Sequence, residues 1–209
     1  MEKWGASMQL EARNVSFGYG NNLILRNVSL SIAQGEHIGL VGPSGCGKST
    51  LSKLLAGYLH PKGGEILWNG KPLPSRGYCP VQMIYQHPEK AVNPMWRLGK
   101  TVNEAWKPDD TFLESMGIEK AWLRRWPNEL SGGELQRFCI ARALGPQTQF
   151  VIADEMSTML DVITQAQIWK LLMDTIEQRN IGLMMVTHNM DLAKRVCSRI
   201  IWLEELNNL

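Results

Sequence analysis

Residues 42–50 of the chain read Gly-Pro-Ser-Gly-Cys-Gly-Lys-Ser-Thr, and this stretch decides the fold class. It fits the pattern GxxxxGK[ST], in which a glycine-rich loop joins a strand to a helix. The short apolar run His37–Val41 precedes the loop, and leucines at helical spacing follow it within residues 51–55. These flanks predict a strand–loop–helix unit and therefore an α/β fold.

The loop has the chemistry of a phosphate site. Its glycines let the backbone curl with its N–H groups pointing inward, and the following helix adds its positive end. Lys48 supplies a point charge for the β and γ phosphates, and the Ser49 hydroxyl suits Mg²⁺, which prefers oxygen ligands. The candidate nucleotide-binding residues are Gly42, Pro43, Ser44, Gly45, Cys46, Gly47, Lys48, Ser49 and Thr50.

Composition narrows the class of protein. The chain has 209 residues, of which 44% are hydrophobic and 20% charged, so it is a globular chain of one domain or one domain with an insertion. A net charge of +2 gives no indication of a nucleic-acid partner. No apolar stretch is long enough to cross a membrane, and residues 1–14 contain no apolar segment typical of a secretory signal.

Periodicity outlines the remaining elements. Strands are expected over residues 8–17, 23–32, 37–41, 65–68, 150–153, 182–186 and 199–203, and helices over 48–58, 132–144, 162–178 and 190–196. Strand and helix alternate in the second half, which indicates parallel βαβ units. An Asn69-Gly70 turn closes the strand at 65–68.

The stretch from Gln86 to Leu130 differs in character, because prolines interrupt it and strand-like alternation disappears. Short helical pieces over 110–116 and 119–125 fit it better, so we interpret it as a small helical insertion. Trp106, Trp122 and Trp126 are candidates for the core of this insertion, and part of its surface could dock a membrane partner.

Two carboxylates end the apolar run that begins at Phe150, namely Asp154 and Glu155. The carboxyl edge of a parallel sheet is where α/β folds bind ligands, and adjacent strand residues face opposite ways. We therefore expect Asp154 to serve the Mg²⁺ shell and Glu155 to act on the attacking water. A solvated acidic turn is the alternative.

Residues Leu130–Arg137 open a helix with the sequence Leu-Ser-Gly-Gly-Glu-Leu-Gln-Arg. Ser131 and Glu134 can form a capping box, which is a purely structural reading. A cap does not require Gly132 and Gly133, which weaken a helix but bare its first N–H groups for an anion. Capping and anion binding both remain open from this motif.

Taken together, the three motifs resemble those of the nucleotide-binding subunit of ATP-binding cassette (ABC) transporters. GPSGCGKST resembles the Walker A motif, LSGGE the LSGGQ signature and FVIADE the Walker B motif. Gln86 lies where this family has its Q-loop glutamine, His188 at the switch histidine, Asp161 in the D-loop and Tyr19 at the adenine-stacking aromatic. Without the resemblance, His188 could simply begin a helix and Tyr19 could pack beside Phe17.

The resemblance implies a P-loop NTPase (RecA-like) core with an N-terminal antiparallel β subdomain and an inserted α-helical subdomain. Residues 1–209 would form a single ABC ATPase domain. Within it, 1–87 and 145–209 would form the catalytic core with the β subdomain, and 88–144 the helical subdomain that carries LSGGE. Glu134 stands where the signature usually has glutamine, and Met156 where proline usually follows the catalytic glutamate.

The resemblance also implies an ATPase that uses ATP and Mg²⁺, with two cassettes arranged head to tail. Glu155, His188, Lys48 and Gln86 would be catalytic, and Ser49, Gln86 and Asp154 would serve the metal. Ser131, Gly132, Gly133 and Glu134 would complete the partner's site, and Asp161 would belong to the D-loop. The expected partners are a second cassette, permease subunits and an extracytoplasmic solute-binding protein, at the cytoplasmic face of the membrane.

A narrower likeness concerns residues 86–94, 126–133 and 160–168, which are similar to the oligopeptide, dipeptide and nickel importer ATPases. It implies uptake of peptides, nickel or a metal chelate. Two alternatives stay open: an exporter or lipoprotein-release ATPase, and a cassette ATPase without transport, such as a repair or translation factor. Repair ATPases usually separate the Walker motifs by long coiled coils, and no heptads occur between residues 42 and 188 here.

Overall fold

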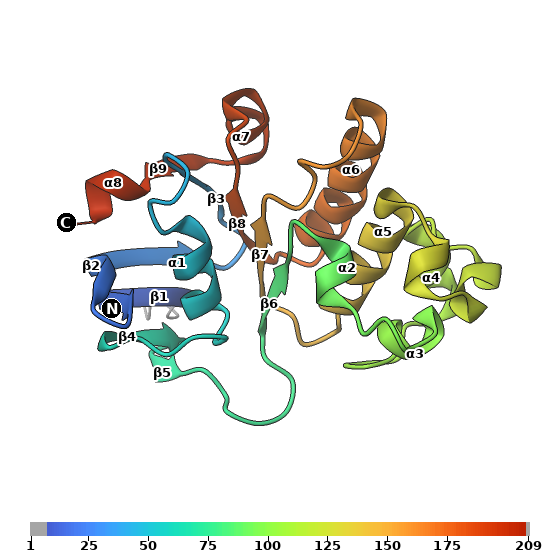
Figure 1. Ribbon diagram of the computed structural model, residues 1–209, viewed down its shortest axis with the longest axis horizontal. Coiled ribbons are helices and arrows are strands. Elements are labelled where there is room, and N and C mark those ends of the chain that lie inside the picture. Colours follow the sequence, from blue (N-terminus) through green and yellow to red (C-terminus); the bar gives the residue numbers. More distant parts are fainter. Residues whose placement is uncertain (1–7, 208–209) are drawn as a thin grey trace, which may run out of the picture.

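The computed structural model describes residues 8–207 and contains two sheets. The expectation about a secretory signal concerns residues 1–7 as well, and these lie outside the described residues. Figure 1 shows the antiparallel strands at one end of the molecule and the short helices within residues 98–115 at the other, with the second sheet between them. Within the described part of the chain, no helix is long and apolar enough to cross a membrane.

The first sheet is antiparallel, with the strand order β2-β1-β4-β5. Its strands are β1 (Gln9–Tyr19), β2 (Asn22–Ala33), β4 (Gly63–Trp68) and β5 (Lys71–Pro72). Asn69 and Gly70 both have positive φ, 52° and 72°, as a type I′ hairpin turn requires, so the predicted turn is present. It continues into β5, a two-residue strand that the sequence did not predict.

The second sheet is parallel, with the strand order β6-β7-β8-β3-β9. Its strands are β3 (His37–Val41), β6 (Val81–Ile84), β7 (Phe150–Asp154), β8 (Gly182–Val186) and β9 (Arg199–Trp202). Four of them were expected within one residue at each end, whereas β6 was not predicted as a strand. The predicted fold class, an α/β core with an N-terminal antiparallel subdomain, is confirmed.

The central strands β7 and β8 are buried on both faces, and β7 illustrates why such strands are mostly apolar. Phe150 and Ile152 belong to a cluster that includes the antiparallel sheet and the leucines of α1 (Lys48–Leu55). Val151 and Ala153 point to a second cluster, which includes α5 (Gly132–Ala143) and α6 (Val162–Gln178). The alternation of side chains along one strand thus joins two cores.

Helix boundaries deviate from the predictions mainly where glycine intervenes. The helix expected to run to residue 58 ends at Leu55, and Gly57 there takes a left-handed φ of 76°. The expected helices over 162–178 and 190–196 are present as α6 and α7 (Met190–Val196). A four-residue helix, α8 (Leu203–Leu206), follows β9 and was not predicted.

The insertion is helical, as expected, but it consists of short pieces. It contains α2 (Pro88–Ala91), α3 (Leu98–Val102), α4 (Asp110–Ser115) and the 3-10 turns η1 (Lys120–Arg124) and η2 (Pro127–Glu129). The α-helical piece expected over 119–125 is therefore a 3-10 turn, and α2 and α3 were missed. Prolines and four-residue lengths leave too little periodicity for such pieces to be recognised.

The three tryptophans of this region have different environments. Trp122 is buried, and the indole N–H of Trp106 lies 3.2 Å from the carbonyl oxygens of Ala141 and Arg142 in α5. Trp126 is 37% exposed, and the Arg97 guanidinium lies 5.1 Å from its ring centroid. Trp122 and Trp106 therefore belong to the packing, whereas Trp126 belongs to the surface.

Candidate functional site

The candidate site residues follow the carboxyl ends of neighbouring parallel strands. The loop of residues 42–47 follows β3, Gln86 follows β6, Asp154 ends β7 and His188 follows β8. A pocket of about 300 Å³ lies at this edge. It is lined by Ile24, Ser44, Gly45, Gly47, Lys48, Ser49, Thr50, Gln86 and Glu155.

The glycines of the loop occupy conformations that other residues rarely adopt. Gly45 has a φ of 81° and Gly47 a φ of 108°. A Cβ on Gly47 would lie 3.0 Å from side-chain carbons of Ile24 and Leu25, so this position also lacks room for a side chain. Gly47 is the N-cap of α1 and offers no side-chain cap, which leaves the first N–H groups of the helix available to an anion.

Lys48 is buried, and its charge is satisfied by the loop itself. Its Nζ donates hydrogen bonds of 2.8 Å to the carbonyl oxygens of Gly42 and Pro43. The Sγ of Cys46 lies 4.0 Å from the same Nζ. The ammonium group is thus held next to the loop amides, where an anion would find both.

Ser49 and Asp154 bring two oxygen donors together from distant parts of the chain. The Ser49 hydroxyl donates to Oδ1 of Asp154 at 3.2 Å. Burial raises the pKa of Asp154, and the hydrogen bond from Ser49 partly opposes this. A hydroxyl and a carboxylate beside a phosphate loop are hard oxygen ligands, so the residues present fit Mg²⁺.

Glu155 and Asp154 are neighbours in sequence but contact different residues, although the expected alternation along a strand is not the cause, because β7 ends at Asp154. Glu155 has left the strand conformation, with a φ of 50°. Its N–H donates to the carbonyl of Val186 at 3.0 Å, and its Oε1 lies 2.5 Å from Nε2 of His188. The structure thus brings Glu155 and His188 together at the pocket.

Gln86 is held from two sides. Its Nε2 donates to Oγ1 of Thr158 at 2.9 Å, and the preceding residue, Tyr85, accepts at its carbonyl from Nε2 of Gln136 at 3.2 Å. Gln136 is buried on α5, whereas Thr158 lies on the loop after β7. The segment at Gln86 therefore contacts both the helix that carries LSGGE and the loop after Glu155.

The LSGGE residues occupy a second pocket of about 530 Å³, and no residue lines both pockets. The capping box is formed: Ser131 Oγ accepts from the Glu134 N–H at 3.3 Å, and Glu134 Oε2 accepts from the Ser131 N–H at 2.7 Å. Gly117, Trp122, Ser131, Gly132, Gly133, Glu134, Arg137, Met159, Leu160, Asp161, Thr164 and Gln167 line this pocket. The structure thus keeps the LSGGE residues apart from the phosphate loop of the same chain.

The loop between β7 and α6 is tied to the helix that follows it. Asp161 is the N-cap of α6, and the hydroxyl of Thr164, which donates to its carboxylate at 2.6 Å, lowers the pKa of Asp161. Ser157 is buried, and its Oγ accepts from the indole N–H of Trp169 at 2.9 Å and from Gln165 at 2.8 Å. Movement of this loop is therefore coupled to α6.

The side chain of Tyr19, the expected adenine-stacking residue, packs against Phe17 instead. Its ring packs edge-on against Phe17 with centroids 5.1 Å apart, and about half of the residue is exposed. Tyr19 is absent from the lining of the phosphate-loop pocket, whereas Ile24 belongs to it. Stacking of Tyr19 on adenine stays a prediction.

Comparison with known proteins decides the family. The family model described as "ABC transporter" matches residues 25–158. The chain belongs to the ABC transporter family. As an ATP-binding subunit of this family, it is an ATPase whose hydrolysis is coupled to transport.

Individual relatives support this assignment. The chain is 35% identical to the "Nickel import ATP-binding protein NikE" of Rhodospirillum rubrum, over 87% of the chain and 73% of that protein. It is 34% identical to the protein of the same name from Escherichia coli K12, over 85% of the chain and 74% of that protein.

Solved structures share the fold. CbiO1 from Clostridium perfringens, described as part of the ABC transporter complex cbiONQ, has a TM-score of 0.77 at 23% identity over 94% of this chain and 84% of that one. A dimeric structure of the ATP-binding cassette MJ0796 bound to ADP and Pi has a TM-score of 0.73 at 26% identity, over 92% of this chain and 93% of that one.

Sequence reasoning missed two side chains that hold the ABC subunit's candidate site together. Gln136 lies two residues beyond Glu134 in α5, and Thr158 lies in the stretch that resembles the D-loop. Neither side chain is charged, and each contacts a residue far away in the sequence, so no local sequence pattern indicates the contact. The one available signal for Gln136 is an amide among the apolar residues of a core helix.

Proposed function

We propose that this ABC subunit hydrolyses ATP to drive an importer of nickel, a metal chelate or peptides. The observation that supports hydrolysis is the gathering of Lys48, Ser49, Asp154, Glu155 and His188 at one sheet edge. The importer class is supported by the 35% identity with a nickel import protein. It is supported further by the likeness of residues 86–94 and 160–168 to peptide and nickel importer ATPases.

In this proposal, Lys48 and the N–H groups of the loop hold the β and γ phosphates of ATP. Lys48 exchanges its bonds to the Gly42 and Pro43 carbonyls for bonds to phosphate oxygens. Ser49, Gln86 and Asp154 hold Mg²⁺. The metal, when bound, neutralises charge on the phosphate oxygens and so assists attack at the γ phosphorus.

Glu155 and His188 have different roles at the γ phosphate. Glu155 orients the attacking water and accepts its proton, for which it must separate from His188, its present contact at 2.5 Å. His188, freed from Glu155, donates to an oxygen of the γ phosphate. Their contact with each other supports a resting state in which neither side chain binds water or phosphate for the reaction.

The second cassette would bind its nucleotide against the LSGGE pocket of this chain. Ser131, Gly132 and Gly133 contact the γ phosphate bound by the partner's loop, with Glu134 and Asp161 beside them. The separation of the two pockets supports this, because one chain alone does not bring both motifs to one nucleotide. The dimeric structure of the cassette MJ0796 gives a precedent in a relative.

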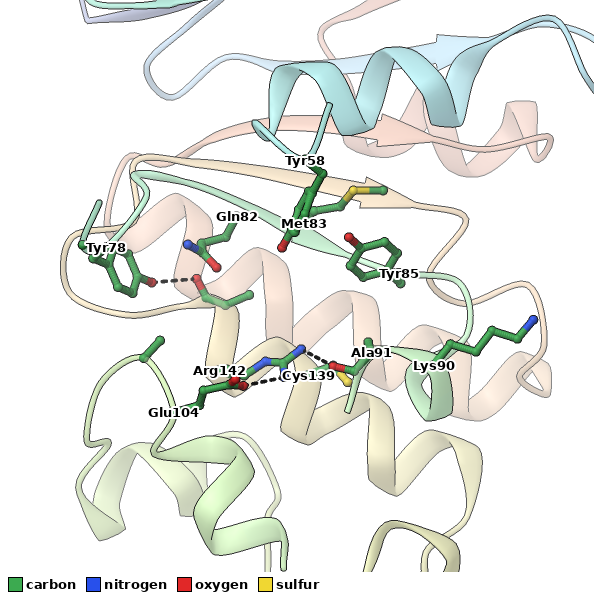
Figure 2. Close-up of a pocket in the computed structure, with 13 residues that line it drawn as sticks. Tyr58, Tyr78, Gln82, Met83, Tyr85, Lys90, Ala91, Glu104, Cys139 and Arg142 are labelled. Atoms are coloured by element: carbon green, nitrogen blue, oxygen red, sulfur yellow. Dashed lines mark hydrogen bonds and ion pairs between the residues drawn. The ribbon is translucent and has the colours of Figure 1, made fainter. Parts of the chain in front are cut away.

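The permease partner would dock in a groove of about 690 Å³ between the parallel sheet and the helical region. Figure 2 shows Tyr58 and Tyr85 on one side of this hollow and Arg142 with Glu104 on the other. Arg142 bonds Glu104 at 3.0 Å and the Ala91 carbonyl at 2.8 Å. Tyr85 directly precedes Gln86, so a segment docked here would contact the residue next to the proposed metal ligand.

The remaining parts of the proposal concern organisation. Residues 88–144 act as a helical subdomain that moves with the permease, and 1–87 with 145–209 act as the catalytic unit. The assembly lies at the cytoplasmic face of the membrane and works with an extracytoplasmic solute-binding protein. The groove between the sheet and the helical region supports this division.

The test of hydrolysis is Glu155→Gln, which keeps the size of the side chain but removes the proton acceptor. Phosphate release should fall by about 100-fold or more, while ATP binding persists and an ATP-bound dimer accumulates in size-exclusion chromatography. Glu114→Gln, at an exposed position of α4, is the matched control and should retain the original rate. Wild-type turnover in Glu155→Gln would contradict the proposed role of Glu155.

The test of cargo is uptake by cells that express the chain with its own permease. Radioactive nickel, with and without a chelator, and labelled dipeptides should be compared for the original chain and for Glu155→Gln. Uptake of one of these cargoes that disappears in Glu155→Gln would support the importer class. Export of the cargo from loaded cells instead would contradict it.

A further inference from the structure

One hydroxyl lies between the proposed metal ligand and the segment that carries the proposed base. Thr158 Oγ1 lies 3.1 Å from the carbonyl oxygen of Glu155 and 2.9 Å from Nε2 of Gln86. Thr158 is itself exposed, and its backbone N–H also donates to the Glu155 carbonyl, at 3.2 Å. The hydroxyl therefore sits on a fixed turn and reaches across to a different strand end.

The direction of these two bonds follows from the chemistry of a hydroxyl. Thr158 has one hydrogen to donate, and a carbonyl oxygen can only accept, so that hydrogen goes to Glu155. With its hydrogen on the Glu155 carbonyl, the hydroxyl accepts the hydrogen bond that Nε2 of Gln86 donates. This pairing turns the NH₂ end of the Gln86 amide toward Thr158 and the amide oxygen away from it.

The backbone before Gln86 is held independently. The Tyr85 carbonyl accepts from Nε2 of Gln136, a buried side chain of α5. The position of the main chain therefore does not depend on Thr158, whereas the rotation of the Gln86 amide does. Gln86 lines the phosphate-loop pocket together with Ser49, so its oxygen is the group of interest there.

We propose that Thr158 is a positioning residue that turns the amide oxygen of Gln86 toward the metal of the nucleotide site. The inference rests on the proposed function, in which Gln86 is an oxygen ligand of Mg²⁺ or of its water. Without the Thr158 hydroxyl, the amide can present its NH₂ group to the metal, and a nitrogen that carries two hydrogens is no ligand for Mg²⁺. Thr158 itself touches neither metal nor nucleotide.

The experiment measures how much Mg²⁺ strengthens ATP binding. Isothermal titration of ATP is carried out with excess Mg²⁺ and with excess EDTA on the full chain carrying Glu155→Gln, so that nucleotide is not consumed. Thr158→Val removes the hydroxyl at nearly constant volume, and Thr158→Ser is the matched control that keeps it. Both changes lie at an exposed position, so the fold should tolerate them.

We expect Thr158→Val to leave the metal-free affinity unchanged and to reduce the Mg²⁺-dependent gain by about threefold to tenfold, the usual range for one hydrogen bond. Thr158→Ser should keep the gain within about twofold of the parent. In a chain that also carries Gln86→Ala, Thr158→Val should have no further effect, because its action passes through Gln86.

Three results would overturn the inference alone. They are an unchanged gain in Thr158→Val, an equal loss in Thr158→Ser, and a loss of metal-free affinity as large as the loss with metal. A parent chain that binds ATP with no gain from Mg²⁺ would instead overturn the proposed metal site, and the inference with it. The two failures are therefore distinguishable in one set of titrations.

Discussion

Two helices in this molecule have glycine at or directly before their first residue, but their N-terminal N–H groups have different partners. At α1 the N-cap is Gly47, which offers no side chain, and the buried Lys48 follows it. At α5 the N-cap Ser131 and Glu134 already occupy each other's backbone N–H groups. The cap of α1 thus leaves its first N–H groups to an anion, whereas the cap of α5 occupies the N–H groups of Ser131 and Glu134 and does not use those of Gly132 and Gly133.

The surroundings of the two helices extend this contrast. The loop before α1 lies among the ends of parallel strands, which supply an acid, a histidine and a glutamine. Beside the α5 pocket, the apolar residues Met159, Val162 and Ile163 are 65%, 80% and 72% exposed. Apolar residues gathered at such exposure mark a contact surface. We therefore expect α1 to carry its own site and α5 to contribute one face of a site.

Lys48→Ala tests whether α1 binds the nucleotide without help from α5. Loss of a buried cation that is held for phosphate should weaken ATP binding by about 100-fold, measured by nucleotide titration of the isolated chain. Lys170→Ala, which removes an exposed ion pair with Asp174 on α6, is the control and should bind ATP normally. Unchanged ATP affinity in Lys48→Ala would mean that α1 is not the primary site.

Ser131→Ala tests the second helix. ATP binding to a single chain should be unchanged, whereas phosphate release at concentrations that permit dimers should fall by about tenfold, because a contact to the partner's phosphate is lost. The lost cap should also lower the free energy of unfolding by about 1 kcal/mol. Nucleotide titration, phosphate release and urea unfolding separate these effects. Weakened ATP binding by the monomer would contradict the division between the two helices.

Gly133→Ala adds a single methyl group in the first turn of α5 and tests how closely this turn packs. A Cβ here would lie 2.6 Å from Cγ2 of Thr164, whose hydroxyl is held by Asp161. We expect a loss of about 1–3 kcal/mol in urea unfolding. Gly132→Ala, with its nearest atom at 3.8 Å, is the control. Thr164→Ser removes the clashing methyl and should restore stability to Gly133→Ala; failure to do so would show that the cause lies elsewhere.

The smallest expected effect concerns Asp154 in the ligand-free chain. Burial raises its pKa above the ordinary value of 3.8, so the folded chain binds this proton more tightly than the unfolded chain does. The resulting stability is full below the unfolded pKa and is lost as pH rises through the folded pKa. Asp154→Asn should therefore raise Tm slightly at neutral pH, and the difference should vanish toward pH 3. A constant difference across this range would contradict the assigned cause.

Much of this molecule could be predicted from sequence because its elements are strongly patterned. Strands such as Phe150–Asp154 are buried on both faces and appear as continuous apolar runs, and the loop at 42–50 has a unique spacing. The order of motifs then indicated Gln86 and His188, which follow β6 and β8, the strands on either side of β7. Alternation alone could not identify α2, α3 and α8, because helices of four or five residues contain hardly more than one turn.

The contacts made by individual side chains were less predictable. The Glu155–His188 contact joins two residues that the family resemblance had named separately, whereas the Gln86–Thr158 bond depends on a turn after β7 that no pattern specifies. Tyr19 shows the reverse case: the resemblance favours adenine stacking, and the side chain packs on Phe17. Motif spacing predicts which residues gather at an edge, but the partner of each is chosen by local backbone geometry.

The bond from Trp169 to Ser157 has a practical consequence for spectroscopy. Trp169 is a buried residue of α6, and its indole N–H donates to the loop that follows the proposed base. Indole emission shifts in wavelength when such a donor loses its acceptor to water. Rearrangement of this loop during a catalytic cycle would therefore be recorded by a chromophore that the chain already carries, without any attached dye.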